Sequence, residues 1–265
     1  MLELSFEKEV VKTLTTGSNQ WVERKDRYGT TPDQLWANFR DKLNNNNYAK
    51  LQGYPLTDTE FNQVKRAIEV RTPYEAAKLL AAENGIGKVE VERDDAKLGT
   101  VTLELFWKVD VAGGKSSYEV VRQAVRPRLA GTQNVDPDRR FDVTLLINGL
   151  PLIQLELKKA TVELNQAFNQ IEKYAQEGKY TGIYSLLQMF VIMTPDSTAY
   201  FANAEPDHFN KAFLFNWRTR DNHPVENGLA FTRQVLNISM AHKIVSEYTV
   251  IDQERQSLIL LRPYQ

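Results

Sequence analysis

Apolar residues in the first 87 positions recur at helical spacing, and capping residues precede them. A Thr that can accept a hydrogen bond from the backbone three residues on, with Gln or Glu at that third position, marks a helix start. Three such starts occur, at Thr31, Thr57 and Thr72, and Pro follows two of them at the first helical position. The pattern predicts helices over residues 32–43, 58–70 and 73–83.

Between residues 88 and 205 the period changes to two, which is typical of strands. Short alternating runs around Val89, Val101 and Tyr118 predict an antiparallel meander. Longer runs over residues 141–147 and 152–158 continue it, joined by Asn148-Gly149, a pair that favours a hairpin because both residues tolerate positive φ. The remaining predicted elements are helices over 163–177 and 231–248 and strands over 186–193 and 198–201.

These elements predict an α/β fold with a mixed, largely antiparallel central sheet flanked by helices. A mostly helical part (residues 1–87) precedes the sheet core (88–205), and a helical end (206–250) follows. No repeat, low-complexity tract or obvious linker separates the three parts, and the length suits one large domain or two small ones.

The composition is that of a globular protein, with 42% hydrophobic and 25% charged residues among 265. Cysteine is absent, which excludes disulfides, thiolate nucleophiles and sulfur-ligated zinc. The first residues lack a basic leader, and no later run reaches the roughly 20 apolar residues of a membrane span. We therefore expect a cytoplasmic protein with no membrane contact.

The net charge of −1 argues against nucleic-acid binding by bulk electrostatics, so any DNA contact must be local. Between residues 115 and 159 there are eight basic residues against five acidic ones. The arginines of this stretch are candidate phosphate contacts, although ordinary solvated surface is the alternative. They are Arg122, Arg126, Arg128, Arg139 and Arg140.

The predicted hairpin carries residues suited to phosphodiester hydrolysis. That reaction needs carboxylates to hold a metal ion and a cation to stabilise the attacking hydroxide or the developing charge. Asp142 lies at the start of the first strand, while Glu156 and Lys158 are two apart in the second and leave the same face. An exposed sheet face with a cross-strand ion pair is the alternative interpretation.

A shared metal site restricts the hairpin register. A two-residue Asn148-Gly149 loop with a regular ladder would pair Asp142 with Leu155 and send its side chain away from Glu156. We therefore predict either a three-residue loop, with Pro151 opening the second strand, or a bulge that shifts the register by one.

These residues resemble a known nuclease family. Arg140-Phe141-Asp142 and, fourteen positions after Asp142, Glu156-Leu157-Lys158 resemble the PD-(D/E)xK motif, with Phe141 where the family usually has Pro. The segment from Asn148 to Leu152 is similar to the hairpin of type I restriction motor subunits. Gln170 and Tyr174 match the QxxxY motif of these subunits, and their i, i+4 spacing places them on one helix face.

Two further segments resemble the same subunits. Tyr118 to Gln123 is similar to the strand that precedes the nuclease hairpin, and Leu261 to Gln265 resembles the glutamine motif that opens superfamily-two helicase motors. The resemblance therefore implies a nuclease domain over residues 1–250, with a restriction-endonuclease-like core, and the truncated start of a motor over 251–265. No complete Walker motif is present, so we expect no ATPase activity from this chain.

The resemblance also implies the roles of individual residues. Asp142 and Glu156, with the backbone carbonyl of Leu157, would bind Mg²⁺, and Lys158 would position or activate the water. Gln170 and Tyr174 would support the site or contact DNA. Two further assignments concern Glu7, which matches an acidic residue that many such nucleases contribute from an N-terminal helix, and Gln265, which would read the adenine of ATP in the full-length protein only.

The function implied is that of a Mg²⁺-dependent endonuclease in a bacterium or archaeon, which cuts double-stranded DNA after ATP-driven translocation by motor domains outside this chain. Its partners would be double-stranded DNA, the methyltransferase and specificity subunits, and the C-terminal helicase motor of the full-length chain. Two alternatives stay open: a non-catalytic module that docks DNA or the motor, and the nuclease domain of another helicase–nuclease fusion.

Overall fold

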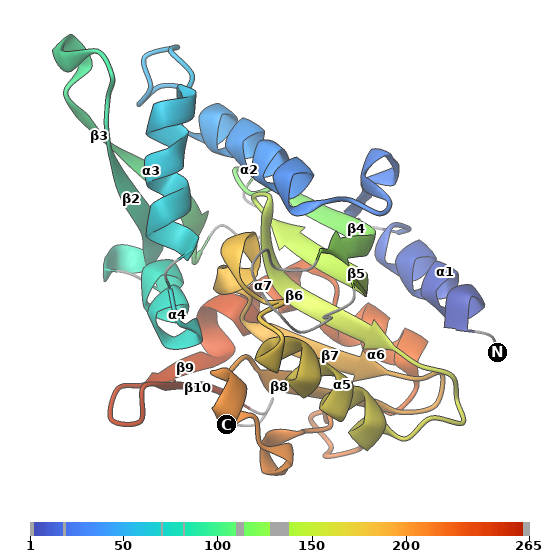
Figure 1. Ribbon diagram of the computed structural model, residues 1–265. Coiled ribbons are helices and arrows are strands. Elements are labelled where there is room, and N and C mark those ends of the chain that lie inside the picture. The colour runs from blue at the N-terminus through green and yellow to red at the C-terminus, as the bar shows by residue number, and fades with distance from the viewer. Residues whose placement is uncertain are drawn as a thin grey trace.

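The structure is a computed structural model, in which residues 3–17, 20–69, 71–81, 83–109, 114–127 and 138–261 are described. A six-stranded sheet with the order β1-β4-β5-β6-β7-β8 forms its centre (Figure 1). The β1–β4 and β6–β7 pairs are parallel and the other three are antiparallel, which confirms the predicted mixed, largely antiparallel sheet. Its strands are β1 (Val22–Glu23), β4 (Tyr118–Arg126), β5 (Arg139–Ile147), β6 (Leu150–Leu157), β7 (Met189–Met193) and β8 (Thr198–Ala202).

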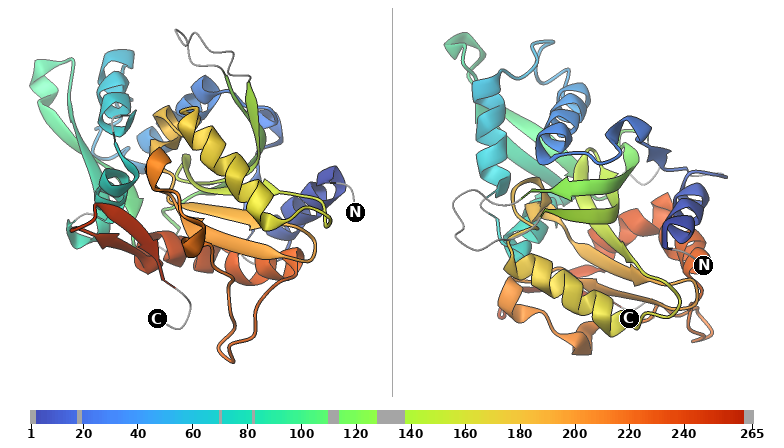
Figure 2. Two further views of the ribbon diagram at one scale, coloured as in Figure 1. Left: turned by 60° about the horizontal axis from the view of Figure 1, so that its bottom comes forward. Right: turned by 45° about the vertical axis from the view of Figure 1, so that its right-hand side comes forward.

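Helices cover both faces of this sheet. The helices are α1 (Glu3–Leu14), α2 (Pro32–Asn46), α3 (Asp58–Glu69), α4 (Pro73–Ala81), α5 (Leu164–Gln176), α6 (Gly228–Val235) and α7 (Ile238–Lys243). Helix α5 packs on β6 and β7, and α1 contacts α6 as well as β5 and β6 (Figures 1 and 2). Every residue of β6 and β7 is consequently buried. No described helix is both long enough and apolar enough to cross a membrane.

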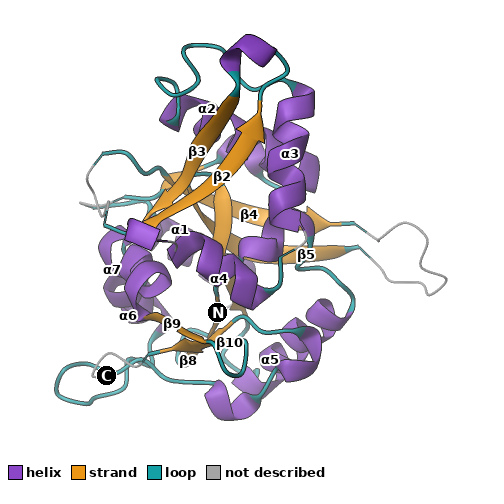
Figure 3. Ribbon diagram, turned by 90° about the vertical axis from the view of Figure 1, so that its left-hand side faces the viewer, coloured by secondary structure: helices purple, strands orange, loops and turns teal. Residues whose placement is uncertain are grey.

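The helical N-terminal part forms as the capping residues predict. In all three predicted capping boxes the Thr hydroxyl accepts from the backbone amide three residues on, and the Gln or Glu side chain accepts from the Thr amide. This part packs on a separate two-stranded antiparallel sheet of β2 (Ile86–Glu92) and β3 (Thr100–Trp107), which stands beside α3 (Figure 3). The prediction of one continuous meander is therefore wrong, because β2 and β3 pair only with each other among the described strands.

The C-terminal region differs from its prediction. The helical structure predicted over residues 231–248 forms, but it is interrupted, because Asn237 caps a new helix, α7, by accepting from the amide of Met240 at 3.0 Å. A π-helical turn (Ile244–Tyr248) leads into the hairpin of β9 (Thr249–Asp252) and β10 (Ser257–Leu260). Gln265 and the rest of the predicted glutamine motif after Leu261 lie outside the described residues. The boundary between nuclease and motor stays a prediction.

Candidate active site

The hairpin of β5 and β6 has the shifted register that a shared site requires. Its loop has two residues, since Ile147 pairs with Leu150, and Asn148 and Gly149 adopt φ of 55° and 79°. The register then shifts by one residue between Leu145 and Leu146. The predicted bulge is confirmed, and the three-residue loop is not what forms. The backbone of Phe39 leaves no room for a side chain at the turn, since a Cβ on Gly149 would lie 2.8 Å from its Cα.

The shift brings the two candidate metal ligands onto one face. Val143 pairs with Leu155, so the shifted register carries Asp142 to the position opposite Glu156. Asp142 Oδ2 accepts a hydrogen bond of 2.8 Å from the amide of Leu157, which ties the carboxylate to the end of β6. Figure 1 shows that β6 runs toward the space between α1 and α5. Side chains of both helices can therefore reach the acidic pair.

Three of the predicted residues surround Glu156. Its Oε1 accepts from Lys158 Nζ at 2.5 Å and from Gln170 Nε2 at 2.6 Å. Gln170 also donates to the hydroxyl of Tyr174, one turn further along α5, at 2.8 Å. Because Glu156 is only 2% exposed, the alternative of a solvent-exposed ion pair on the sheet is wrong. The sequence-predicted residues Asp142, Glu156, Lys158, Gln170 and Tyr174 thus lie together.

Burial is the largest influence on both carboxylates, since removing a charged group from water favours its neutral form. Burial raises the pKa of Asp142 to about 6, although the amide of Leu157 and the ammonium of Lys158 oppose the shift. Burial raises the pKa of Glu156 to about 8, and the charge of Asp142 adds to the increase. The pKa of Lys158 is raised in spite of its burial, because Glu156 and Asp142 stabilise the ammonium. Both acids therefore resist ionisation in the metal-free site, mainly because they are buried and, at Glu156, also because of the charge of Asp142.

Gln123 connects this pair to the N-terminal helix. The register of β4 and β5 places it opposite Asp142. Its Nε2 donates to Glu7 Oε2 at 2.6 Å and to Asp142 Oδ1 at 3.5 Å. Its backbone is left-handed, with φ of 53°, in the middle of a strand. Such a conformation costs roughly 1–3 kcal/mol for a residue other than glycine and is characteristic of functional sites.

The left-handed backbone has a visible consequence for α1. Arg122 Nε donates to Glu7 Oε1 at 2.7 Å, so consecutive residues of β4 contact the same carboxylate. Neighbouring side chains of a regular strand leave opposite faces, which would prevent this. The irregularity at Gln123 therefore allows both side chains to hold Glu7, the predicted acidic residue of the N-terminal helix, near the site.

Phe141 supports the site by packing. Its buried ring stacks on Tyr174 and Tyr180, with centroids 6.1 and 5.0 Å away, and meets Tyr184 edge-on at 5.1 Å. A proline at this position would restrict the backbone directly. In this chain aromatic packing anchors β5 next to Asp142.

The oxygen atoms of the candidate residues suit a Mg²⁺ site. Mg²⁺ takes oxygen ligands and is usually bound by one or two carboxylates with several waters retained. Two buried, mutually repelling carboxylates fit this requirement, with the Leu157 carbonyl as the predicted third ligand. Among the described residues no three acidic or histidine side chains form a metal-binding group by themselves. Glu7 binds Arg122 and Gln123, and its role as a ligand stays a prediction.

The candidate phosphate-binding arginines have different environments. Arg122 is held by Glu7, and Arg139 donates to Glu177 at 2.8 Å. Arg126 is buried and donates to two backbone carbonyls, so the interpretation as solvated surface is wrong for it. Of those described, only Arg140 is exposed, and Arg128 lies outside the described residues.

Sequence analysis missed the role of Gln123. A left-handed glutamine leaves no trace in a hydrophobic pattern, because glycine and asparagine are the residues that announce positive φ. Its bonds also depend on Glu7, more than a hundred positions earlier in the chain. The one available signal was its place at the end of the segment that resembles the strand before the nuclease hairpin.

Comparison with known proteins identifies a family for this chain. Residues 4–209 match the family model described as type I restriction enzyme R protein N terminus. The endonuclease subunit of the type I restriction enzyme SauCOLORF180P of Staphylococcus aureus (strain COL) is 31% identical over 263 residues, which is 99% of this chain and 26% of that relative. The endonuclease subunit of EcoprrI of Escherichia coli is 39% identical over 129 residues, 48% of this chain and 41% of that relative.

The chain spans about a quarter of the length of the staphylococcal relatives that it matches. The match nevertheless includes the β5–β6 hairpin, α5 and both candidate carboxylates. The chain belongs to the family of type I restriction enzyme R protein N-terminal regions.

Proposed function

We propose that this chain is a Mg²⁺-dependent endonuclease domain that cleaves phosphodiester bonds of double-stranded DNA. The observation that carries the proposal is the one-residue bulge, which sets Asp142 opposite Glu156 on one face of the hairpin. The raised pKa values of these two acids add support, because a carboxylate pair that its own surroundings leave under-neutralised is suited to a divalent cation. Bound there, Mg²⁺ supplies Lewis-acid activation at the scissile phosphate.

Asp142, Glu156 and the Leu157 carbonyl would hold the metal, and Lys158 would act on the water. The raised pKa of Lys158 keeps it an ammonium at neutral pH, so we assign it to orienting the attacking water and stabilising negative charge. Gln170 orients Glu156 through its 2.6 Å bond, and Tyr174 fixes Gln170 in turn. We infer that these two residues act through Glu156.

We infer that the full-length subunit combines this domain with an ATP-driven motor. Residues 251–265 would begin that motor, and Gln265 would contact the adenine of ATP. Cleavage would follow translocation, with methyltransferase and specificity subunits in the same complex. These proposals rest on the greater length of the relatives and on their names, which describe endonuclease subunits of type I restriction enzymes.

The first experiment measures nicking of supercoiled plasmid with Mg²⁺ by the 265-residue chain and by the full-length subunit in its complex. Asp142→Asn, Glu156→Gln and Lys158→Ala are each expected to lower cleavage by at least about 100-fold. Glu104→Gln is the control, because Glu104 lies on β3 of the separate sheet and its carboxylate binds Lys50. ATP hydrolysis by the full-length subunit should be unchanged in all four variants.

Cleavage that survives in all three site variants would contradict the proposal. It would favour the non-catalytic module that docks DNA or the motor. A variant that loses cleavage because it no longer folds is identified by circular dichroism. In that case Mg²⁺ binding to the unsubstituted chain tests the site instead.

A further inference from the structure

A basic hollow lies beside the candidate active site, on the side of α1. Its volume is about 440 Å³, and α1 forms one wall with Lys8 and Lys12. Lys25 and Tyr28, from the segment after β1, form the other wall, and Arg122 from β4 completes it. We call this hollow the lysine groove. Figure 2 shows α1 at the edge of the molecule.

The three lysines of the groove carry charge that the protein does not use. Lys8, Lys12 and Lys25 are exposed, and none of them forms an ion pair with any residue that the structure describes. Arg122, in contrast, is neutralised by Glu7 and by Glu23, the acidic residue among the groove's lining. The chain has a net charge of −1, so these three lysines concentrate positive charge at the groove that the molecule as a whole does not have.

The spacing of the lysines suits a polyanion. Lys8 and Lys12 are four residues apart and lie on one face of α1, about 6 Å apart along the helix axis. Phosphates of one DNA strand follow one another at about 3.4 Å along the duplex axis. The pair therefore spans roughly two phosphates, and Lys25 approaches from the opposite wall.

Three hydrogen-bonded side chains link the groove to the active site. Arg122 lines the groove and binds Glu7, Glu7 also accepts from Gln123, and Gln123 reaches Asp142. The groove and the acidic pair are therefore connected through the side chains of Arg122, Glu7 and Gln123.

We propose that the lysine groove binds the phosphate backbone of the DNA duplex next to the scissile bond. This rests on the proposed nuclease function. The groove adds cations to the ammonium of Lys158 at the acidic site, where Asp142 and Glu156 repel the phosphates that they must approach. Contacts of this kind position DNA without reading its sequence.

The experiment measures binding of a fluorescent 30-base-pair duplex to the 265-residue chain carrying Glu156→Gln, by anisotropy at several salt concentrations. In this background the triple variant Lys8→Gln, Lys12→Gln, Lys25→Gln is expected to bind about 10- to 100-fold more weakly at low salt. The slope of log affinity against log salt should fall by about 2 to 3, since each phosphate contact contributes about one. The control is Lys78→Gln, Lys88→Gln, Lys97→Gln, three exposed lysines of α4 and the β2–β3 region, with an expected change below about twofold.

Three outcomes would overturn the groove. They are an equal loss in both triple variants, DNA binding by the parent that does not depend on salt, and competition by polyglutamate as effective as that by DNA. The result is separable from the nuclease proposal, because it measures binding without cleavage. If binding in the Glu156→Gln background depends on the groove but the chain with Glu156 intact never cuts DNA, the proposed nuclease function is contradicted and the groove proposal is not.

Discussion

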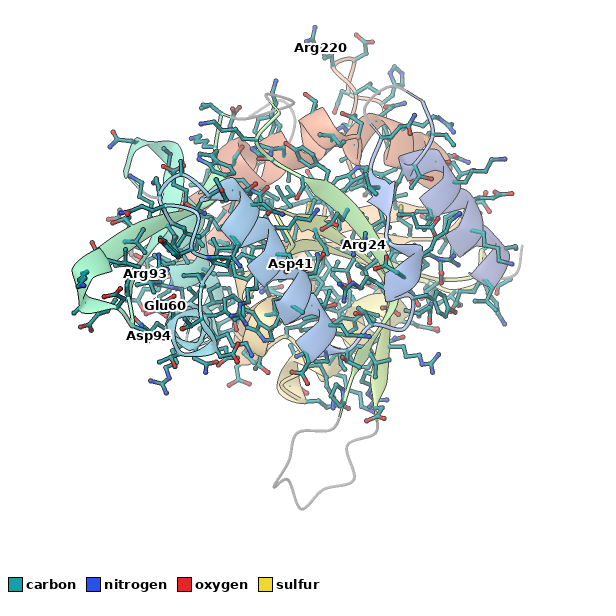
Figure 4. The ribbon with its side chains drawn as sticks, turned by 90° about the horizontal axis from the view of Figure 1, so that it is seen from above. Arg24, Asp41, Glu60, Arg93, Asp94 and Arg220 are labelled. Atoms are coloured by element: carbon teal, nitrogen blue, oxygen red, sulfur yellow. The ribbon has the colours of Figure 1, made fainter. Side chains whose placement is uncertain are left out.

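Glu60 and Glu156 both expose almost no surface to solvent, at 1% and 2%, yet Glu156 lies far deeper in the protein and the pKa values of the two acids shift in opposite directions. Glu60 accepts from Arg93 Nε at 2.8 Å and from the backbone amides of Thr57 and Asp94 at 2.9 and 2.8 Å. Figure 4 shows Glu60, Arg93 and Asp94 close together, beside the β2–β3 region. Burial acts to raise the pKa of Glu60, but these donors together outweigh it and the pKa is lowered.

Glu156 also accepts hydrogen bonds, but the negative charge of Asp142 lies close to it. Lys158 and Gln170 donate to a single oxygen of Glu156, while burial and the charge of Asp142 act against ionisation. Low solvent exposure alone therefore does not distinguish a structural acid from a functional one. What distinguishes them is whether the chain itself completes the neutralisation, as it does around Glu60, or leaves part of it to a ligand.

The largest effect is expected when the ion pair between Glu60 and Arg93 is broken. Arg93→Ala should leave Glu60 as a buried charge with backbone donors only, and lower the free energy of unfolding by about 3–5 kcal/mol. Urea denaturation followed by circular dichroism measures this. A loss below about 1 kcal/mol would mean that Glu60 is no better neutralised than Glu156, and the contrast would fail.

The next effect concerns Glu156 in the metal-free chain. Its pKa is raised on folding, so its contribution to stability is full below the unfolded value near 4.3 and is lost as pH rises through about 8. The raised pKa of Asp142 acts in the same direction between about 3.9 and about 6. With a chelator present, Glu156→Gln should therefore increase stability at pH 8, by roughly 1–2 kcal/mol, and give almost no gain at pH 5.

Glu60→Gln is the matched control for that measurement, because its pKa is lowered on folding and its loss should reduce stability at pH 8. Thermal melts at both pH values compare the two variants. If Glu156→Gln destabilises the chain at pH 8 as Glu60→Gln does, Glu156 is an ordinary structural acid.

The smallest effect on stability is expected at Gln123, which contacts both Glu7 and Asp142. Gln123→Gly relieves the left-handed backbone and removes the bonds to Glu7 and Asp142, so stability should change by less than about 1 kcal/mol. Affinity for Mg²⁺, measured by calorimetry, should fall about 10-fold, as is usual when a residue that orients a ligand is lost. Gln63→Ala, which removes a glutamine bound to the backbone of Glu92, should leave Mg²⁺ affinity unchanged. Unchanged affinity in Gln123→Gly would limit Gln123 to a structural role.

Local signals in the sequence were sufficient for the parts of the fold that depend on neighbouring residues. The capping boxes at Thr31, Thr57 and Thr72 and the turn at Asn148-Gly149 act within four residues, and all of them form as predicted. The bulge could also be predicted, because two side chains were required to share a face. Period-two alternation could not say which strands pair, so the separation of β2 and β3 from the central sheet was missed.

The candidate site was predictable where its residues lie on one hairpin and the following helix. Asp142, Glu156, Lys158, Gln170 and Tyr174 span 33 positions and do lie together. The lysine groove was not predictable, since α1, the segment after β1 and β4 meet only in the folded chain. Counting charges between residues 115 and 159 pointed to arginines that are mostly paired or buried.

The one-residue bulge in β6 gives a parity rule for related hairpins. A two-residue loop with a regular ladder brings opposite one another only positions separated by an odd number, whereas the acids of this chain are separated by an even one. A loop that is longer by one residue can therefore replace the bulge, and the two acids still lie opposite one another. A relative whose spacing differs by one from this chain should be judged by whether its ladder has also gained or lost an irregularity.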